Sequence, residues 1–438
     1  MLHSRKRDRG GNGLPWYRNP SFLADGSFPA LNMDFIENRY ALNGAPIPLS
    51  SIATFTRSTT KTYVDSTGQI QNAAIDAPAF IYDPETFAPL GLSIESSITN
   101  NAFRSEQPNQ AYWTKNNTTV TINKPTAPDG NSTSCELIET TGIGLTYSIS
   151  RLVTVTATIG QPYTISFFVK PNVRNQAFLK LLTATFGTDQ VGIFNLTGSG
   201  SVASMTGGGT ASIKYYAKYG FYRVSITATA TAATSISIEY GAASAGAITY
   251  DGTLSNVALN FWGMQLENNN YASSYIQTPT AVGVTRAADS LTTSSIGAWA
   301  NASTGSMLSD SISYTPTTVE AVPYAFTDGT VNNTLEAVYG ATGTLTARRI
   351  LAGASSLSTG LTYTQAVRYK TGMASSVAGS KFAVNNVLYT PTGAAAMPAV
   401  SQFDIGMRLN SIYLNGPIRS LIYYPIVLTD ATLQAKTV

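Results

Sequence analysis

The chain has 438 residues, 43% of them hydrophobic and only 12% charged, against about 25% charged in an average soluble domain. This length allows two or three domains with sizeable cores, and the hydrophobic content excludes a wholly disordered chain. The net charge is +3, but residues 1–19 alone carry a net +4. The rest of the chain therefore has no basic excess, and we expect no nucleic-acid binding.

Residue usage excludes several kinds of site. The single cysteine, Cys135, and the single histidine, His3, allow neither an internal disulfide nor a Cys/His zinc site within one chain. No apolar run approaches the roughly 20 residues of a membrane helix. The basic start of the chain lacks the apolar stretch of a signal peptide. We therefore expect no membrane insertion. We expect the chain to be assembled in the cytoplasm of a host cell.

Residues 1–30 are rich in Gly, Pro and Arg and show no periodicity, which predicts an extended basic N-terminal arm. The segment contains both basic and aromatic side chains, and we expect them to dock on another protein. The docking candidates are Arg5, Lys6, Arg7, Arg9, Trp16, Tyr17 and Arg18.

Residues 31–100 carry short β signals and predict a small β-hairpin attachment segment. Thr62–Asp65 and Gln69–Ile70 flank Ser66-Thr67-Gly68, where glycine supplies the turn conformation of a hairpin.

Residues 101–283 repeat strand signals about every ten residues, without intervening helices. Tyr222–Ile226 and Ser235–Glu239 alternate with a period of two. Evenly spaced short strands predict a jelly roll. The expected strands are 164–170, 178–186, 191–196, 211–218, 221–230, 235–240 and 257–267.

Residues 284–438 form a second β series after a predicted linker at 287–304. Asn385-Asn386 suits a tight hairpin, because Asn tolerates positive φ. Thr429 or Asp430 can cap one short helix through Ala435. The expected strands are 311–314, 320–326, 334–339, 346–352, 363–369, 381–384, 387–389 and 418–424.

Several stretches, read together, resemble bacteriophage head-spike, head-fibre and tail-fibre proteins over residues 31–438. The middle region resembles carbohydrate-binding-module jelly rolls, and the last resembles concanavalin-type or laminin-G-like sandwiches. The stretches that carry the resemblance include Leu31-Asn-Met-Asp-Phe35, Phe55-Thr-Arg-Ser58, Thr62-Tyr-Val-Asp65, Gly91-Leu-Ser-Ile-Glu95, Phe103-Arg-Ser-Glu106, Ser166-Phe-Phe-Val-Lys170, Trp262-Gly-Met-Gln-Leu-Glu267, Thr285-Arg-Ala-Ala-Asp289 and Leu414-Asn-Gly-Pro-Ile-Arg419.

The pattern and the resemblance together predict an all-β chain of two consecutive jelly-roll sandwiches behind an arm and a small β segment. The expected units are 1–30, 31–100, 101–283 and 284–438. The resemblance implies a virion location, other virion proteins as partners and a homotrimer. We expect a structural fibre or spike subunit that contributes to attachment to host-surface glycans. The alternative is a capsule-degrading tailspike-type glycosidase.

Glycan binding requires aromatic faces, and the chain has 24 Tyr, 17 Phe and 4 Trp. Tyr215 and Tyr216 must point to opposite faces of a strand, so one of them is expected to be exposed or at an interface. Trp262 lies in an apolar run and is expected in the core. The glycan-binding candidates are Trp113, Tyr147, Tyr215, Tyr216 and Tyr219.

We expect no cofactor and no catalysis. A structural calcium ion could use Asp251 and Glu267, but no run of alternating acids marks a loop site. His3 lies in the arm, which argues against a catalytic triad. Glycoside hydrolysis needs two facing carboxylates. The acids on or near predicted strands are Glu239, Asp251, Glu267, Glu320 and Glu336.

Overall fold

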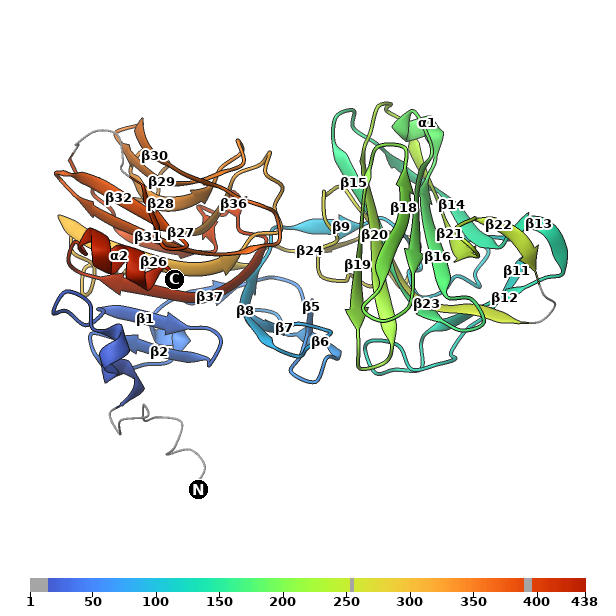
Figure 1. The fold of residues 1–438 in the computed structure, drawn as a ribbon, viewed down its shortest axis with the longest axis horizontal. Coiled ribbons are helices and arrows are strands. Elements are labelled where there is room, and N and C mark those ends of the chain that lie inside the picture. The colour runs from blue at the N-terminus through green and yellow to red at the C-terminus, as the bar shows by residue number, and fades with distance from the viewer. Residues whose placement is uncertain (1–14, 253–255, 390–395) are drawn as a thin grey trace, which may run out of the picture.

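The computed structural model describes residues 15–252, 256–389 and 396–438. These residues form almost only strands, arranged in two β-sandwiches that lie side by side (Figure 1). The predicted all-β jelly-roll class is therefore confirmed. Neither α-helix in the described residues is long and apolar enough to cross a membrane.

The first sandwich, called the inserted sandwich here, spans residues 101–283 and contains two six-stranded antiparallel sheets. One sheet runs β10 (Thr114–Asn116), β14 (Ser148–Thr156), β21 (Ser235–Ala243), β16 (Gln176–Leu181), β17 (Gln190–Asn195) and β18 (Ser201–Thr206). The other runs β11 (Thr118–Thr121), β12 (Cys135–Glu139), β23 (Val257–Glu267), β15 (Pro162–Pro171), β20 (Phe221–Thr229) and β19 (Thr210–Tyr216). A ribbon of β13 (Gly142–Thr146) and β22 (Thr249–Gly252) and the short helix α1 (Thr183–Phe186) complete it.

Alternation of side chains builds this core. In β15, Ile165, Phe167 and Val169 point between the sheets and are fully buried. Phe168 points the other way and joins Trp262 in a second buried cluster. The predicted core position of Trp262 is confirmed.

The second sandwich, called the split sandwich here, is built from residues 15–94 and 290–438. Its ten-stranded sheet has the path β3 (Ala45–Pro46), β2 (Arg39–Leu42), β1 (Leu31–Asp34), β37 (Gly416–Tyr424), β26 (Thr304–Ile312), β31 (Arg368–Ser376), β32 (Gly379–Val384) and β33 (Val387–Tyr389), with β8 (Pro89–Ile94) on β37 and β7 (Ala79–Tyr82) on β8. Its seven-stranded sheet runs β30 (Ala354–Thr362), β29 (Thr344–Leu351), β28 (Thr334–Tyr339), β27 (Ala321–Thr327), β34 (Gln402–Ile405), β25 (Ser290–Thr293) and β4 (Thr54–Thr56).

Small elements complete the fold. The ribbons are β5 (Lys61–Val64) with β6 (Ile70–Ala73), and β35 (Met407–Arg408) with β36 (Ile412–Tyr413). The connection between the sandwiches is β9 (Ile98–Asn100) paired with β24 (Val284–Arg286). The helices are η1 (Trp16–Arg18), η2 (Pro20–Phe22), η3 (Leu49–Ser51) and α2 (Asp430–Lys436).

The predicted order of two consecutive sandwiches differs from this topology. Residues 31–94 form no unit of their own, because β1 pairs with β37 and β4 pairs with β25. The predicted linker 287–304 contains β25, and Trp299 is 5% exposed against Phe403 and Tyr423. Local patterns mark strands but do not state which distant strand each one pairs with.

The described part of the predicted arm, residues 15–30, packs on the split sandwich and is not extended. Trp16 is 6% exposed. The Tyr424 hydroxyl donates to the Phe22 carbonyl at 2.7 Å, and Asp25 accepts from the Thr429 backbone N–H at 2.7 Å. The sequence shows no periodicity here because two single-turn 3-10 helices build the segment.

Most predicted strands occur within a few residues of their expected ends, and 257–267, 334–339 and 387–389 match in full. The hairpin at 61–73 and the turn at Asn385-Asn386, with φ of 44° and 69°, are confirmed. The predicted cap is confirmed at Thr429, which accepts from the Thr432 N–H. The strand at 363–369 is wrong, because Ala366 has φ of 62° and the chain turns there. Strand 178–186 ends at Leu181, before α1.

A buried ionic cluster lies where the chain crosses between the sandwiches. We call Arg57, Lys61, Glu95, Arg286 and Asp289 the junction cluster. All five are at most 5% exposed. Asp289 pairs with Arg57 Nη1 at 2.9 Å and Lys61 Nζ at 2.6 Å, and Glu95 pairs with Arg286 Nη1 at 2.6 Å. The arginine and lysine hold the pKa of Glu95 below its ordinary value despite its burial. All of these residues except Lys61 lie in stretches that carry the sequence resemblance. Three of those stretches therefore supply the charged side chains of the junction cluster.

Candidate functional site

A groove of about 850 Å³ opens at one edge of the split sandwich, called the edge groove here. It lies where β4 ends one sheet and β2 and β3 end the other, so both sheet edges border it. Its volume falls in the range of small-ligand sites. The lining residues are Trp16, Asn38, Arg39, Tyr40, Pro46, Ile47, Pro48, Leu49, Ser50, Ala53, Thr54, Phe55, Asp76, Pro78 and Phe80.

Prolines explain why the sandwich stays open at this edge. Pro46 ends the two-residue edge strand β3, and Pro48 precedes η3. Proline has no backbone N–H, so it cannot extend a ladder of hydrogen bonds. Pro78 similarly precedes β7. Prolines therefore stand at or beside the ends of the short elements that border the groove.

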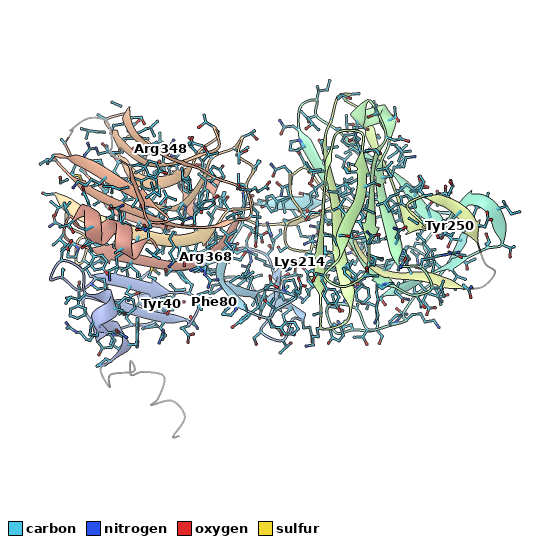
Figure 2. The ribbon with its side chains drawn as sticks, in the orientation of Figure 1. Tyr40, Phe80, Lys214, Tyr250, Arg348 and Arg368 are labelled. Carbon is cyan, nitrogen blue, oxygen red and sulfur yellow. The ribbon has the colours of Figure 1, made fainter. Side chains whose placement is uncertain are left out.

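Four aromatic side chains from separate elements form the apolar part of the edge groove. Trp16 and Tyr40 are each 6% exposed, whereas Phe55 and Phe80 are half-buried. Figure 2 labels Tyr40 and Phe80 on the same side of the split sandwich. The Tyr40 hydroxyl donates to Asn38 Oδ1 at 2.7 Å, and burial raises the pKa of Tyr40. The rings are thus held in place and present apolar surface to a ligand.

Polar groups stand beside these rings. The Arg39 guanidinium lies over the Trp16 ring, 5.1 Å from its centroid, and its Nη2 pairs with Asp34 at 2.9 Å. Its Nε is buried and has no hydrogen-bond partner among the described residues. Asp76 is exposed, and its Oδ1 accepts from the Arg57 N–H at 2.9 Å.

Two of the polar residues adopt left-handed backbone conformations. Asn38 has φ of 52° and Asp76 has φ of 56°. Asn and Asp tolerate this region better than other residues with a Cβ, and such conformations concentrate at functional sites. The edge groove therefore combines aromatic rings with two hydrogen-bonding side chains, Asn38 and Asp76, whose backbone adopts the left-handed conformation.

The edge groove has few titratable side chains that could act as a general acid or base. Among its described lining residues, Asp76 carries the one carboxylate, whereas glycoside hydrolysis uses two. The arrangement suits binding of a partly apolar, hydroxylated molecule.

The structure places the glycan candidates Trp113 and Tyr147 inside the inserted sandwich. Trp113 is 2% exposed and packs edge-on against Tyr240, and its Nε1 donates to the Arg104 carbonyl. Tyr147 is fully buried, and its hydroxyl donates to the Gly142 carbonyl. Neither ring can stack on a sugar, because both are enclosed in the buried core of the inserted sandwich.

The other three candidates lie at one edge of the inserted sandwich. Tyr215 is half-buried against Tyr222, and Tyr216 packs against Phe168 on the opposite face, as the alternation predicts. The Tyr219 hydroxyl donates to Gln69 Oε1 at 3.0 Å, which joins the two sandwiches. Tyr219 is therefore an interface residue, and of the five only Tyr215 retains exposed surface away from a contact with residues 15–94.

Among the docking candidates, Arg5, Lys6, Arg7 and Arg9 lie outside the described residues. Trp16 is a wall of the edge groove. Tyr17 stacks edge-on against it at 5.8 Å, and the Arg18 guanidinium lies over Phe28. These three residues contact their own chain.

The calcium candidates Asp251 and Glu267 are far apart. Arg174 donates from its guanidinium to the Asp251 carbonyl and from its backbone N–H to the carbonyl of Ala258, at the start of β23. Glu267 ends the same strand, roughly 30 Å away at the rise of a β-strand. No group of three or more His, Cys, Asp or Glu side chains suited to a metal occurs in the described residues. The sequence placed both acids in one domain but could not give their separation.

The acids considered for glycoside hydrolysis do not form a free pair. Arg348 lies between Glu320, at 2.6 Å, and Glu336, at 2.7 Å. Its hydrogen bonds lower the pKa of Glu320, which opposes a role as general acid. Glu239 instead accepts from Ser148 Oγ at 2.5 Å, and Glu267 is buried beside Ser273.

Sequence reasoning missed Phe55, Asp76 and Phe80 as site residues. A signal was present in the closely spaced Pro46-Ile47-Pro48 and in Asp76-Ala77-Pro78, which mark chain that leaves the sheet. Nothing local shows that these stretches meet.

No family model and no curated protein matches the sequence. Similar solved structures include the CBM40 module of the Ruminococcus gnavus IT-sialidase, with 13% identity over 32% of this chain and 84% of that chain at a TM-score of 0.27. Domain 4 of AbnA, a GH43 arabinanase from Geobacillus stearothermophilus, shows 11% identity over 34% and 73% at 0.30. Domains LG4-5 of the mouse laminin α1 chain show 9% over 65% and 87% at 0.22. Likeness at these TM-scores carries no argument about function.

Proposed function

We propose that this chain is a non-catalytic structural subunit of a bacteriophage fibre or spike that binds cell-surface glycans, and that the edge groove is its saccharide site. The observation that carries the glycan part is the combination, in one cavity, of four aromatic side chains with Asn38, Arg39 and Asp76.

Saccharides have apolar C–H faces and polar hydroxyl edges, so a site for them needs both kinds of surface. Phe55 and Phe80 present ring surface in the edge groove. Asp76 is exposed in the groove and can accept hydrogen bonds from sugar hydroxyls. A few placed polar groups within an apolar pocket fix the orientation of a ligand.

The test is binding of the purified full-length chain to an array of bacterial surface polysaccharides, followed by calorimetry with the strongest binder. Phe80→Ala is expected to weaken binding at least tenfold, about 1.4 kcal/mol, because it removes a ring face. Asp76→Asn is expected to weaken it less, since it retains one acceptor oxygen.

The matched control is Tyr215→Ala, which removes a half-buried aromatic ring of the inserted sandwich. It should leave glycan affinity unchanged. Binding that survives Phe80→Ala in a folded protein but is lost in Tyr215→Ala would move the site to the inserted sandwich. Absence of binding to every polysaccharide would contradict the proposal.

The competing function is a capsule-degrading glycosidase. Incubation of the chain with the bound polysaccharide should release no new reducing ends. Reducing ends that disappear in Glu320→Gln or Glu336→Gln would establish the enzyme instead.

The virion part of the proposal rests on the sequence resemblance and on the low charge of the chain. A homotrimer would raise the effective affinity of weak single sites through multivalency. Light scattering is expected to give three chains per particle at micromolar concentration, and mass spectrometry of intact phage is expected to contain the chain. A monomer, or absence from particles, would contradict this part.

A further inference from the structure

A second cavity, of about 460 Å³, adjoins the edge groove, and we call it the hydroxyl cavity. It lies on the outer face of the seven-stranded sheet, over β4, β25 and β34. The register places Thr292 opposite both Thr54 and Asp404. Its lining residues are Ser50, Ser51, Ile52, Ala53, Thr54, Thr292, Thr293, Ser294, Ser295 and Gln402.

The chemistry of the hydroxyl cavity differs from that of the edge groove. Eight of its ten lining residues carry a hydroxyl or an amide, and none carries a charge. An anionic ligand group would lose its hydration there without gaining a counter-ion. The lining therefore suits an uncharged, polyhydroxylated molecule.

A buried carboxylate orients two of these groups. Asp404 is fully buried, and its Oδ1 accepts from Thr292 Oγ1 at 2.7 Å and from Gln402 Nε2 at 2.6 Å. With its proton committed to Asp404, the Thr292 hydroxyl offers lone pairs to a ligand, and the Gln402 amide offers its oxygen. The cavity thus presents acceptors to groups that donate, as sugar hydroxyls do.

The two cavities are adjacent and share part of their lining. Ser50, Ala53 and Thr54 line both of them, and the hydroxyl-bearing Ser50 and Thr54 are exposed. Thr54 points to the outer face of the sheet, whereas the next residue, Phe55, points into the edge groove. A molecule lying across β4 would therefore meet hydroxyl groups on one side and aromatic rings on the other.

We propose that the edge groove and the hydroxyl cavity are consecutive subsites for one neutral oligosaccharide chain. The inference rests on the proposed glycan binding and adds that the ligand is a polymer segment without charged groups. One sugar unit would stack in the edge groove, and the following units would cross Thr54 and hydrogen-bond in the hydroxyl cavity. Charge balance supports this, since Arg39 and Asp76 are the two charged residues lining either cavity and have opposite signs.

The experiment is calorimetry with oligosaccharide ladders of one to six units. The neutral ladders are maltose-, cellulose-, xylan- and mannan-derived, and an oligogalacturonate ladder is the acidic comparison. Affinity for at least one neutral ladder should rise tenfold or more between one and four units and then level off. The acidic ladder should bind at least tenfold more weakly.

The diagnostic variant is Ser294→Ala combined with Ser295→Ala, because both residues are exposed and the change does not endanger folding. It should lower hexasaccharide affinity three- to tenfold and leave the shortest binding fragment unchanged. Phe80→Ala should weaken both. Thr56→Val is the control, since Thr56 is an exposed residue of β4 that lines neither cavity.

Length-independent affinity, or equal effects of the Ser294/Ser295 change on short and long fragments, would overturn the two-subsite inference while leaving glycan binding intact. Preference for an extended uncharged peptide pairing with β4 would overturn it as well. If no ladder binds and the polysaccharide array is also negative, the proposed function fails with it.

Discussion

The two sandwiches contrast in how their chain is assembled. The inserted sandwich is continuous in sequence, from residue 101 to residue 283, and its interior contains two of the five aromatic residues expected to bind glycans, Trp113 and Tyr147. The split sandwich is assembled from the two ends of the chain, and its open edge forms the edge groove. Strands β4 and β25, whose sequence positions differ by more than 200 residues, lie next to each other there.

This contrast shows why local sequence patterns did not locate the candidate binding site. In the inserted sandwich the two sheets pack closely, and most aromatic side chains between them are buried in the core, because burial of a ring is strongly favourable. The edge groove remains open because β4 belongs to one sheet and β2 and β3 belong to the other, and the two sheets do not pair with each other across it. The following three predictions test the junction cluster, the inserted sandwich and the split sandwich in turn.

The largest effect is expected at the junction cluster, which lies where the chain crosses between the sandwiches. Asp289→Asn should lower the free energy of unfolding by about 3–5 kcal/mol, because it leaves Arg57 and Lys61 buried without their shared carboxylate. Denaturant unfolding followed by tryptophan fluorescence and circular dichroism measures this.

The control for this change is Asp430→Asn, which breaks an exposed pair with Lys381. Exposed pairs contribute about 1 kcal/mol or less. Equal costs for the two variants would contradict a large contribution of the junction cluster to stability.

A smaller effect concerns Glu106 in the inserted sandwich. Burial raises its pKa from 4.5 to about 7, although Tyr275 OH donates to it at 2.9 Å. The folded state therefore binds the proton more tightly than the unfolded state between pH 4.5 and 7. Stability from this group is present below pH 4.5 and is lost as pH rises through 7, by up to about 3 kcal/mol.

Glu106→Gln should remove this decline, as measured by urea unfolding between pH 4.5 and 8. Glu136→Gln, on β12 of the same sandwich, should leave the decline in place. Glu95 in the junction cluster has the opposite shift, so its contribution is present above its unfolded pKa and is lost towards lower pH. Parallel curves for wild type and Glu106→Gln would contradict the assignment.

The smallest effect tests how the two ends of the chain hold each other in the split sandwich. Thr429→Ala should cost about 1 kcal/mol, because Thr429 caps α2 and its hydroxyl also contacts Asp25 at 3.2 Å. Thr429→Ser, which retains the hydroxyl, should cost less than half as much. Thermal unfolding of the three proteins compares them, and an unchanged midpoint for Thr429→Ala would contradict the role of the cap.

The sequence by itself determined the elements whose signals are local. Strand signals at 257–267 and 334–339 predicted β23 and β28 in full, Asn385-Asn386 predicted a turn, and Thr429 predicted a cap. Each signal arises within a few residues, because the period of a strand and the conformation of a turn are properties of neighbouring backbone units.

Only the tertiary structure decided which strands pair and which faces stay open. Trp113 was a glycan-binding candidate but is buried by chain that folds over it, whereas Phe80 had no local mark and borders the edge groove. Strand pairing between β1 and β37 joins residues nearly 400 positions apart. The free energy of such contacts depends on surfaces brought together by the whole chain, and no short window of sequence contains that information.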